Sequence, residues 1–259
     1  MIQPNYYLII KCVDCNFRLL VNDRPLYHLD RGANINTQLP INSFYLPAGN
    51  QFNCIITPVK GFNTISETSK LIIKFIQDLP YGDSKEISSF ETPSYKVDEK
   101  NPAKSSDNIS GELNMSIPYK PVLSTGLSLN DALTLKNELY GKYYNVLILL
   151  KEKKVDEVVS LFSLRIKDIA GLNGQSESEI TEGVKKDYQS YVDDSSLELW
   201  EFTIDKVFVK IYGNKKIACL EVANGNHPIC FLNRKDRIAI YIPLYFFRNS
   251  TTQQLEVIR

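Results

Sequence analysis

Apolar and polar side chains alternate in short runs through the first part of the chain. Turn-forming residues such as Asn22-Asp23-Arg24-Pro25 separate the runs, and no helical period lies between them. The runs occupy residues 7–9, 17–21, 26–29, 35–41, 52–57 and 71–76. Alternation with period two is typical of strands that bury one face. The pattern therefore predicts an all-β sandwich.

The next stretch, residues 83–110, is dominated by Lys, Glu, Ser, Asp and Pro. That composition favours a long hairpin excursion or a mobile loop. Leu113, Met115 and Ile117 alternate again and predict a final strand. Because residues 118–121 resemble a stiff linker, we expect the sandwich to span residues 1–122 and a second domain to span 123–259.

The apolar period changes from two to about 3.6 in the second domain. Three helices are expected, at residues 128–150, 155–162 and 176–191. Ser128 with Asp131, and Ser176 with Glu179, have the spacing of capping boxes at the starts of the first and third helices. Gly141 lies inside the first helix and costs about 1 kcal/mol relative to Ala.

Strand-like alternation returns after residue 197. Apolar residues of 200–204 share one parity and those of 207–211 share the other, which predicts one long strand with a β-bulge near Asp205-Lys206. Further strands are expected at 217–222, at 229–232 and from 238 onward, where Pro243 favours an edge position or another bulge. The second domain is therefore expected to be α+β, with three helices and one bent antiparallel sheet of four long strands.

Two turn sequences of the first domain carry a resemblance to a known kind of domain. Leu20-Val21-Asn22-Asp23 is followed by Leu46-Pro47-Ala48-Gly49-Asn50 and then by an apolar strand. The pair resembles the turns of jelly-roll or immunoglobulin-like accessory sandwiches of bacterial proteins. Some of those sandwiches bind sugars through exposed aromatic rings, so the resemblance also implies a carbohydrate-binding module as an alternative function.

The order of elements in the second domain, helices followed by a bent sheet with a bulged long strand, resembles the cone-shaped fold of nuclear transport factor two and ketosteroid isomerase. Enzymes of that family use an acid or base on a pocket wall, with tyrosine or a protonated carboxyl group as oxyanion donor. The resemblance implies a pocket, and its candidate residues here are Asp187, Tyr188, Glu201, Asp205 and Tyr241.

Charge and cysteine content narrow the classes of partner. The 259 residues carry 30 basic and 30 acidic side chains, whereas proteins that bind nucleic acid usually have a basic excess. Five cysteines are an odd number, and four of them lie in apolar strand-like runs, where a thiol behaves as a small hydrophobic group. Without a signal peptide or an apolar run long enough to span a membrane, we expect a cytoplasmic protein.

Residues that usually carry catalysis or bind metals are scarce. Cys12 and Cys15 have redox or zinc spacing, but no second pair of ligands lies nearby in the sequence. His28 and His227 are interpreted as loop histidines, and no nucleophile elbow, phosphate loop or zinc-protease motif is present. We therefore expect no catalytic residues, cofactor or metal.

Two features near the end of the chain are candidates for binding a partner. The segment 233–237 is the densest basic patch, and its Arg234, Lys235 and Arg237 could contact an acidic protein. Within the aromatic run 241–248, Tyr245, Phe247 and Arg248 are residue types enriched at binding hot spots, although a core role for this run is the alternative.

These observations favour a non-enzymatic protein that binds another protein. Two-domain chains of this kind resemble the immunity or adaptor proteins of bacterial toxin and secretion systems. The alternative is a small-molecule-binding protein or an isomerase- or hydratase-type enzyme that uses the cone pocket. The pattern leaves the oligomeric state open.

Overall fold

A computed structural model describes residues 5–30, 32–44, 49–78, 83–115, 126–129, 132–213 and 215–258. Contacts between Cα atoms divide the chain into two compact units, Met1–Lys120 and Pro121–Arg259. Some predicted features lie outside the described residues. They are Leu46-Pro47-Ala48 of the second turn sequence, Ile117 of the final strand, the linker at 118–121, and Asp131 of the first capping sequence.

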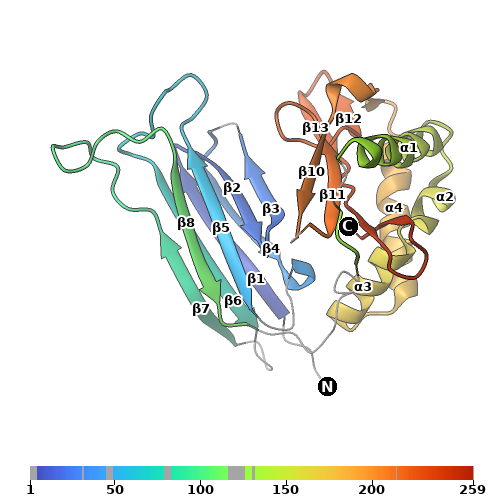
Figure 1. Ribbon diagram of the computed structural model, residues 1–259, viewed down its shortest axis with the longest axis horizontal. Coiled ribbons are helices and arrows are strands. Elements are labelled where there is room, and N and C mark those ends of the chain that lie inside the picture. The colour runs from blue at the N-terminus through green and yellow to red at the C-terminus, as the bar shows by residue number, and fades with distance from the viewer. Residues whose placement is uncertain are drawn as a thin grey trace. The chain divides into compact units, whose positions relative to one another are not determined.

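The first unit is built of antiparallel strands, as the alternation predicts (Figure 1). Its strands are β1 (Asn5–Val13), β2 (Asn16–Val21), β3 (Arg24–Leu29), β4 (Ile35–Pro40), β5 (Asn50–Thr57), β6 (Lys70–Asp78), β7 (Ser84–Glu91) and β8 (Asp107–Leu113). The described strands form two four-stranded sheets, with orders β4-β1-β6-β7 and β3-β2-β5-β8. Apolar residues of alternating strand positions lie between the sheets, and their polar neighbours are exposed.

Phenylalanine rings join the two sheets. Phe52 on β5 lies 4.4 Å from Phe90 on β7 and 5.4 Å from Phe75 on β6, measured between ring centroids. Gly111 on β8 pairs with Phe52, and a Cβ atom at this glycine would lie 2.9 Å from the rings of both Phe52 and Phe90. The rings therefore fill the space that a side chain at position 111 would need.

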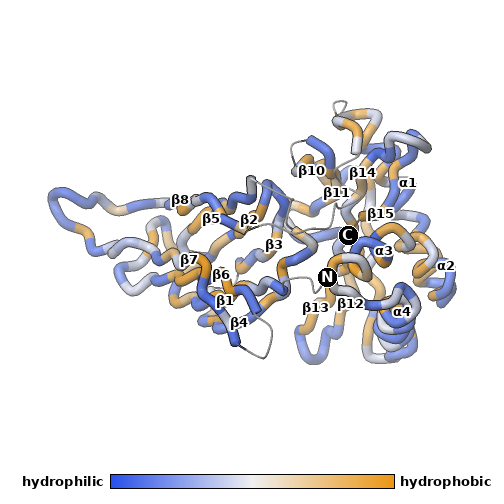
Figure 2. Tube along the Cα trace, turned by 90° about the horizontal axis from the view of Figure 1, so that it is seen from below, coloured by the Kyte–Doolittle hydropathy of each residue, from blue (hydrophilic) through white to orange (hydrophobic). Residues whose placement is uncertain are grey.

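The polar stretch 83–110 differs from the prediction, because it is neither a hairpin nor only a loop. It contains β7, which pairs with β6, and the start of β8, which pairs with β5 in the other sheet. Both strands lie at sheet edges, where one face and one row of backbone groups are open to water, so their sequences are polar. Only residues 92–106 between them form a loop, which is mostly hydrophilic (Figure 2).

Two asparagines close one end of the sandwich. The side chain of Asn22, between β2 and β3, donates to the Asn50 side-chain oxygen at 2.6 Å and to the Phe44 carbonyl at 2.8 Å. Asn50 in turn donates to the carbonyl oxygen of Met115 at 2.7 Å. Both amides are buried, so each hydrogen bond satisfies groups that water does not reach.

The second unit contains helices and antiparallel strands, which agrees with an α+β class at the coarse level. Its described helices are α1 (Ala132–Lys151), α2 (Val155–Ser160), α3 (Ser163–Asn173) and α4 (Glu177–Asp193). Helix α4 begins with the predicted capping box: the Ser176 hydroxyl accepts from the Glu179 N–H, and the Glu179 carboxylate accepts from the Ser176 N–H. The described part thus holds four helices rather than three, because α3 follows α2 after a break of two residues.

The strands of the second unit form two sheets instead of one bent sheet. They are β9 (Glu198–Leu199), β10 (Phe208–Tyr212), β11 (Ile217–Glu221), β12 (Cys230–Asn233), β13 (Ile238–Tyr241), β14 (Phe246–Arg248) and β15 (Leu255–Val257). The sheet orders are β10-β11-β14-β15 and β13-β12-β9. The predicted long strand at 197–212 is wrong: β9 and β10 belong to different sheets, and a 3-10 turn at Ile204–Lys206 joins them. The change of parity marks this turn and not a bulge.

A single apolar core holds the second unit together (Figure 2). Tyr143 on α1 is fully buried at its centre, with its ring against Phe202 and Phe246. Helix α4 contributes Tyr188, which packs on Phe162. No described helix is long and apolar enough to cross a membrane.

Candidate functional site

The aromatic run at 241–248 belongs mainly to the core. Tyr245, Phe246 and Phe247 are buried, and β14 lies between β11 and β15 in its sheet. Tyr245 is 7% exposed and Phe247 is fully buried, so their rings are packed inside the unit. This burial agrees with the core role left open for the run and not with partner contacts at these two residues.

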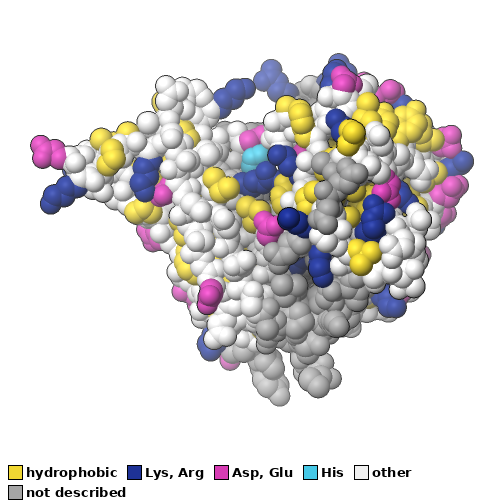
Figure 3. Space-filling model, viewed as in Figure 1, with side chains coloured by type: hydrophobic (Ala, Val, Ile, Leu, Met, Phe, Trp, Pro, Cys, Tyr) yellow, Lys and Arg dark blue, Asp and Glu magenta, His cyan; other side chains and the backbone are white. Residues whose placement is uncertain are grey.

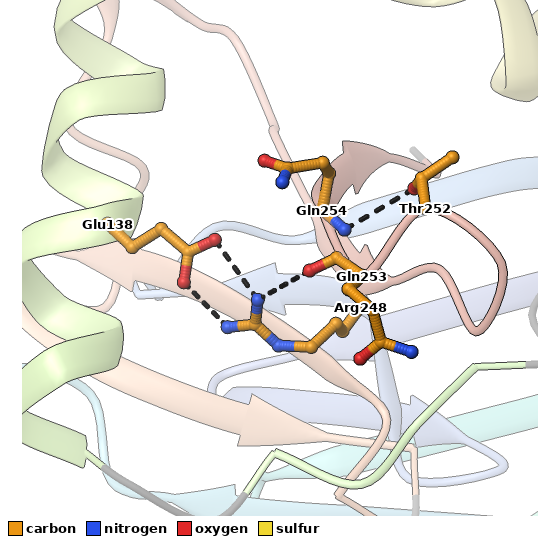
Figure 4. Close-up of polar contacts among 5 residues, drawn as sticks. All are labelled: Glu138, Arg248, Thr252, Gln253 and Gln254. Carbon is orange, nitrogen blue, oxygen red and sulfur yellow. Dashed lines mark hydrogen bonds and ion pairs between the residues drawn. The ribbon is translucent and has the colours of Figure 1, made fainter.

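Arg248, the third predicted contact of that run, is used inside the unit. Its guanidinium donates to the Glu138 carboxylate through two bonds of 2.6 and 3.2 Å, and it also donates to the Gln253 carbonyl at 2.9 Å (Figure 4). Glu138 comes from α1 and Gln253 from the turn between β14 and β15. The three groups tie the first helix to the last hairpin, so Arg248 positions structure and does not extend toward a partner.

The predicted basic patch is exposed at the tip of the β12–β13 hairpin. Arg234 makes a two-bond contact with the Glu198 carboxylate, at 2.7 and 3.1 Å, which neutralises its charge. None of the ion pairs described in this structure includes Lys235 or Arg237. These two cations remain available to a partner, at the rim of the unit.

The predicted pocket residues are not brought together. Asp187, Glu201 and Asp205 are all exposed, and Glu201 pairs with Lys151 at 2.5 Å. Hydrogen bonds from Thr203 and its own backbone lower the pKa of Asp205, with Lys206 and Lys136 adding a smaller effect. Glu201 and Asp205 face water because the segment that was expected to be one long strand contains a turn here.

The two tyrosines of the predicted pocket have different positions. Tyr188 is buried against Phe162 and Tyr191, and burial raises its pKa to about 12. Tyr241 is half-buried at the end of β13, an edge strand of the other sheet. Two depressions that the structure does describe, of 290 and 250 Å³, are lined by none of the five predicted residues.

A buried polar cluster that the sequence analysis missed surrounds Tyr143. The Tyr143 hydroxyl donates to the Leu244 carbonyl at 2.6 Å, accepts from the Leu220 N–H at 3.2 Å, and lies 3.5 Å from His227 Nδ1. The other ring nitrogen of His227 lies 3.1 Å from the Tyr245 hydroxyl. His227 is therefore not an isolated loop histidine, although the turn Asn224–His227 does carry it.

A carboxylate lies in the same part of the core. Glu221 on β11 is buried and accepts a hydrogen bond of 2.6 Å from the Tyr212 hydroxyl. The ring of Tyr212 lies 6.5 Å from that of Tyr245. Burial is also the main reason that the pKa of the Tyr143 hydroxyl is raised well above its usual value. Tyr143, Tyr212, Glu221, His227 and Tyr245 thus form a cluster of titratable groups joined by hydrogen bonds and ring contacts.

One face of α1 carries exposed apolar side chains. Leu133 is 75% exposed and Tyr144 is 46% exposed, and Tyr140 stacks on Tyr144 with ring centroids 5.9 Å apart. Spacings of seven and four residues place the three side chains on one face of the helix. Figure 3 shows hydrophobic side chains gathered over α1. Gly141 borders this face, and nothing lies within 4 Å of the place where its Cβ atom would be.

The segment that begins at residue 200 lies beside α1, with the chain running in the opposite direction to the helix. Phe202 packs on the rings of Tyr140 and Tyr143, and Asp205 lies close enough to Lys136 to feel its charge. Ile204 on this segment is exposed. Phe208 is also exposed but points to the other face of its sheet, because the next residue, Val209, packs on the core. We refer to Leu133, Tyr140, Tyr144 and Ile204 together as the α1 surface.

No group of three or more His, Cys, Asp or Glu side chains within the described ranges is arranged to hold a metal ion. Searches of protein-family models, of curated proteins and of solved structures find no match to this chain.

Proposed function

We propose that this protein acts without catalysis and binds another protein through the α1 surface. The observation that carries the proposal is the exposure of Leu133 and Tyr144 on one face of α1. Single exposed apolar residues are common, but several that share a helix face and the adjoining segment are typical of interaction sites. Tyrosine in particular supplies a large contact area at a small entropic cost.

The backbone and the charges around this surface also favour docking. Gly141 leaves the helix without a side chain beside Tyr144, so a partner could approach the backbone closely. Lys206 lies on the segment beside α1, is exposed, and is in none of the described ion pairs. A partner with apolar side chains and carboxylates would complement the surface, and the exposed Lys235 and Arg237 are separate candidate contacts at the tip of the β12–β13 hairpin.

The class of partner follows from the resemblance to immunity and adaptor proteins of bacterial toxin and secretion systems. We propose a cytoplasmic protein that holds a toxin or a secretion component in a stoichiometric complex. The five cysteines support a reducing compartment, since all of them are buried free thiols.

The test is to capture a partner from lysate of the host cell, identify and purify it, and measure its affinity calorimetrically. We expect Leu133→Asp and Tyr144→Asp each to weaken binding at least about tenfold, which is the usual size of a hot-spot effect. Leu161→Asp, on the same unit, and Phe62→Asp, in the first unit, also place a carboxylate at exposed apolar positions and should leave the affinity unchanged. A purified partner that binds all four variants equally would disprove this site.

A second candidate function rests on the buried Glu221. The enzyme alternative requires a buried carboxylate with a polar neighbour that faces an open cavity. Glu221 with Tyr212 supplies the buried carboxylate and the neighbour, whereas Asp187, Glu201 and Asp205 are exposed. The two described depressions are not lined by Glu221, so its access to a ligand is part of what the proposal assumes. In an isomerase- or hydratase-type reaction, Glu221 would exchange the proton and the Tyr143 or Tyr245 hydroxyl would stabilise the oxyanion.

The second candidate predicts that a small molecule stabilises the protein through this cluster. A thermal-shift screen of hydroxy and keto compounds should then find a ligand whose effect is lost in Tyr212→Phe and Glu221→Gln. A ligand effect that both variants retain would remove the cluster as its site, and the docking proposal would be unaffected.

A further inference from the structure

The turn between β1 and β2 brings two thiols into contact. Cys12 is the last but one residue of β1, and Cys15 directly precedes β2. Their Sγ atoms are 3.3 Å apart, and the Cys12 thiol also lies 3.3 Å from the Cys15 carbonyl oxygen. A disulfide has a sulfur–sulfur distance of about 2.05 Å, so the two atoms need to approach by about 1.3 Å. This approach requires rotation of the two side chains and a change in the turn that carries them.

Asp14, one of the two residues between the thiols, joins its own turn to the β3–β4 loop and the β5–β6 loop. The Asp14 carboxylate accepts from the Thr68 hydroxyl at 2.8 Å, and the Asp14 carbonyl accepts from the Ser69 hydroxyl at 2.6 Å. The Asp14 N–H donates to the Asn34 side-chain oxygen at 3.3 Å. Asp14 has a positive φ of 50°, a backbone conformation that is uncommon for residues other than Gly, Asn and Asp. A change in this turn therefore reaches the β3–β4 loop and the β5–β6 loop directly.

The two thiols are not equivalent. Their mutual hydrogen bond lowers the pKa of Cys12, and the same bond, together with burial, raises the pKa of Cys15. We therefore assign Cys12 as the thiol that reacts first. Both side chains are almost completely buried, so a peroxide reaches the thiols only when the turn between β1 and β2 opens.

We propose that Cys12 and Cys15 form a reversible disulfide in response to a hydroperoxide, and that this modification releases the loops held by Asp14. The Cys12 thiolate attacks one oxygen of hydrogen peroxide, the O–O bond breaks, and Cys12 sulfenic acid and hydroxide form. The Cys15 thiol then attacks the sulfenic sulfur, the S–O bond breaks, and the Cys15 proton leaves with the hydroxyl group as water. The peroxide gains two electrons from the thiol pair, and a thiol reductant reverses the change.

This site is independent of the docking proposal, because it lies in the first unit and uses none of the residues of the α1 surface. Its consequence is local to the end of the sandwich that carries Phe62, a loop side chain that is 71% exposed. Loss of the bonds from Thr68 and Ser69 to Asp14 frees the loop of Phe62 at its β6 end.

The first experiment exposes the folded full-length chain to hydrogen peroxide and measures its intact mass, followed by peptide mapping. We expect the loss of two hydrogen atoms and a Cys12–Cys15 cross-link, restored to the thiol form by dithiothreitol. Cys54→Ser removes a neighbouring buried thiol and should behave as the native chain does, whereas Cys15→Ser should stop at a sulfenic acid that a dimedone probe detects. A native chain that keeps both thiols, or a cross-link that uses Cys54, would overturn the proposal.

The second experiment tests the coupling to the loops. If the disulfide breaks the bonds to Asp14, then removing those bonds in advance favours the disulfide, because coupling between two equilibria is reciprocal. In a glutathione redox buffer, Thr68→Val and Ser69→Ala should therefore show a larger oxidised fraction than the native chain. Thr64→Val, in the same loop and exposed, makes none of the described hydrogen bonds and serves as the control. Equal oxidised fractions in all four proteins would refute the release of the loops.

Discussion

Arg248 on β14 and Glu138 on α1 face each other through two N–H···O bonds, and each side chain is about three-quarters buried, with 26% and 28% exposed. Because the pair is bidentate and partly shielded from water, it is stronger than a typical surface ion pair. We expect Arg248→Ala to lower the free energy of unfolding by about 1 to 2 kcal/mol. Arg248→Lys keeps the charge and loses the two-bond geometry, so its free energy of unfolding in urea titrations should lie between those of the native chain and Arg248→Ala.

A double-mutant cycle checks that this loss belongs to the pair. Glu138→Gln in the Arg248→Ala background should add less than it does in the native chain. Additive effects of the two substitutions would show that Arg248 acts only through its bond to the Gln253 carbonyl in the β14–β15 turn.

The Tyr143 hydroxyl gives a second prediction. Tyr143→Phe removes a group that bonds the Leu244 carbonyl and the Leu220 N–H, and it leaves both buried without that partner. The expected cost is about 1 to 3 kcal/mol of unfolding free energy. Tyr144→Phe changes the next residue, which is exposed, and should be neutral in the same denaturation measurement. Equal stability of the two variants would contradict the role assigned to the hydroxyl.

Two glycines should respond to alanine in opposite ways. Gly111→Ala places a Cβ atom 2.9 Å from the rings of Phe52 and Phe90, so overpacking should cost about 1 to 3 kcal/mol. Gly141→Ala meets nothing within 4 Å inside a helix and should add about 1 kcal/mol of stability. Thermal denaturation of both variants measures the difference. If the α1 surface binds a partner closely, Gly141→Ala should also weaken that complex while stabilising the free protein.

The capping box of α4 predicts a pH dependence. Hydrogen bonds from the Ser176 N–H and hydroxyl lower the pKa of Glu179 from its usual value of 4.5. A carboxylate whose pKa is lower in the folded state stabilises that state above its unfolded pKa, and the stabilisation is lost as pH falls through the folded value. Melting temperatures measured from about pH 6 down to about pH 3 should therefore fall more in the native chain than in Glu179→Gln. Glu182→Gln, on the same helix outside the box, should keep the native pH profile.

Local sequence patterns predict the elements whose interactions are also local. Ser176 and Glu179 are three residues apart, and the bond between them depends only on that spacing. Asn22 and Asn50 were identified as parts of two separate turns, and the structure joins them at 2.6 Å. The sequence indicates such turns, but the pairing of one turn with another depends on how β2 and β5 align.

Predictions from polarity are wrong where an element lies at an edge. The sequence of β7 suggests a loop because it contains the exposed Lys85 and Glu86, of which Glu86 pairs with Lys74 on the neighbouring strand. The alternation of residues 197–212 suggests one strand because the 3-10 turn at Ile204–Lys206 is short and the residues at both its ends are extended. Neither the edge strand nor the short turn has a distinct apolar period, so pairing with distant strands determines their structure.

The two kinds of candidate site differ in how far sequence could reveal them. The cluster of Tyr143, His227 and Glu221 joins residues up to 84 positions apart, and no spacing rule brings them together. The α1 surface belongs to a helix that the apolar period predicts at residues 128–150. The period alone does not show which side of the helix is buried, and in the structure Leu135, Leu139 and Tyr143 form the core side.

The two ends of the sandwich are closed by different kinds of bond. At one end buried amides of Asn22 and Asn50 bind backbone carbonyls, and at the other the exposed hydroxyl of Thr68 binds the carboxylate of Asp14. Water can replace a lost bond at the second end but not at the first. Accepted mutations and insertions in related chains should therefore accumulate in the 58–69 and 92–106 loops, which makes this end the place to graft a new binding sequence.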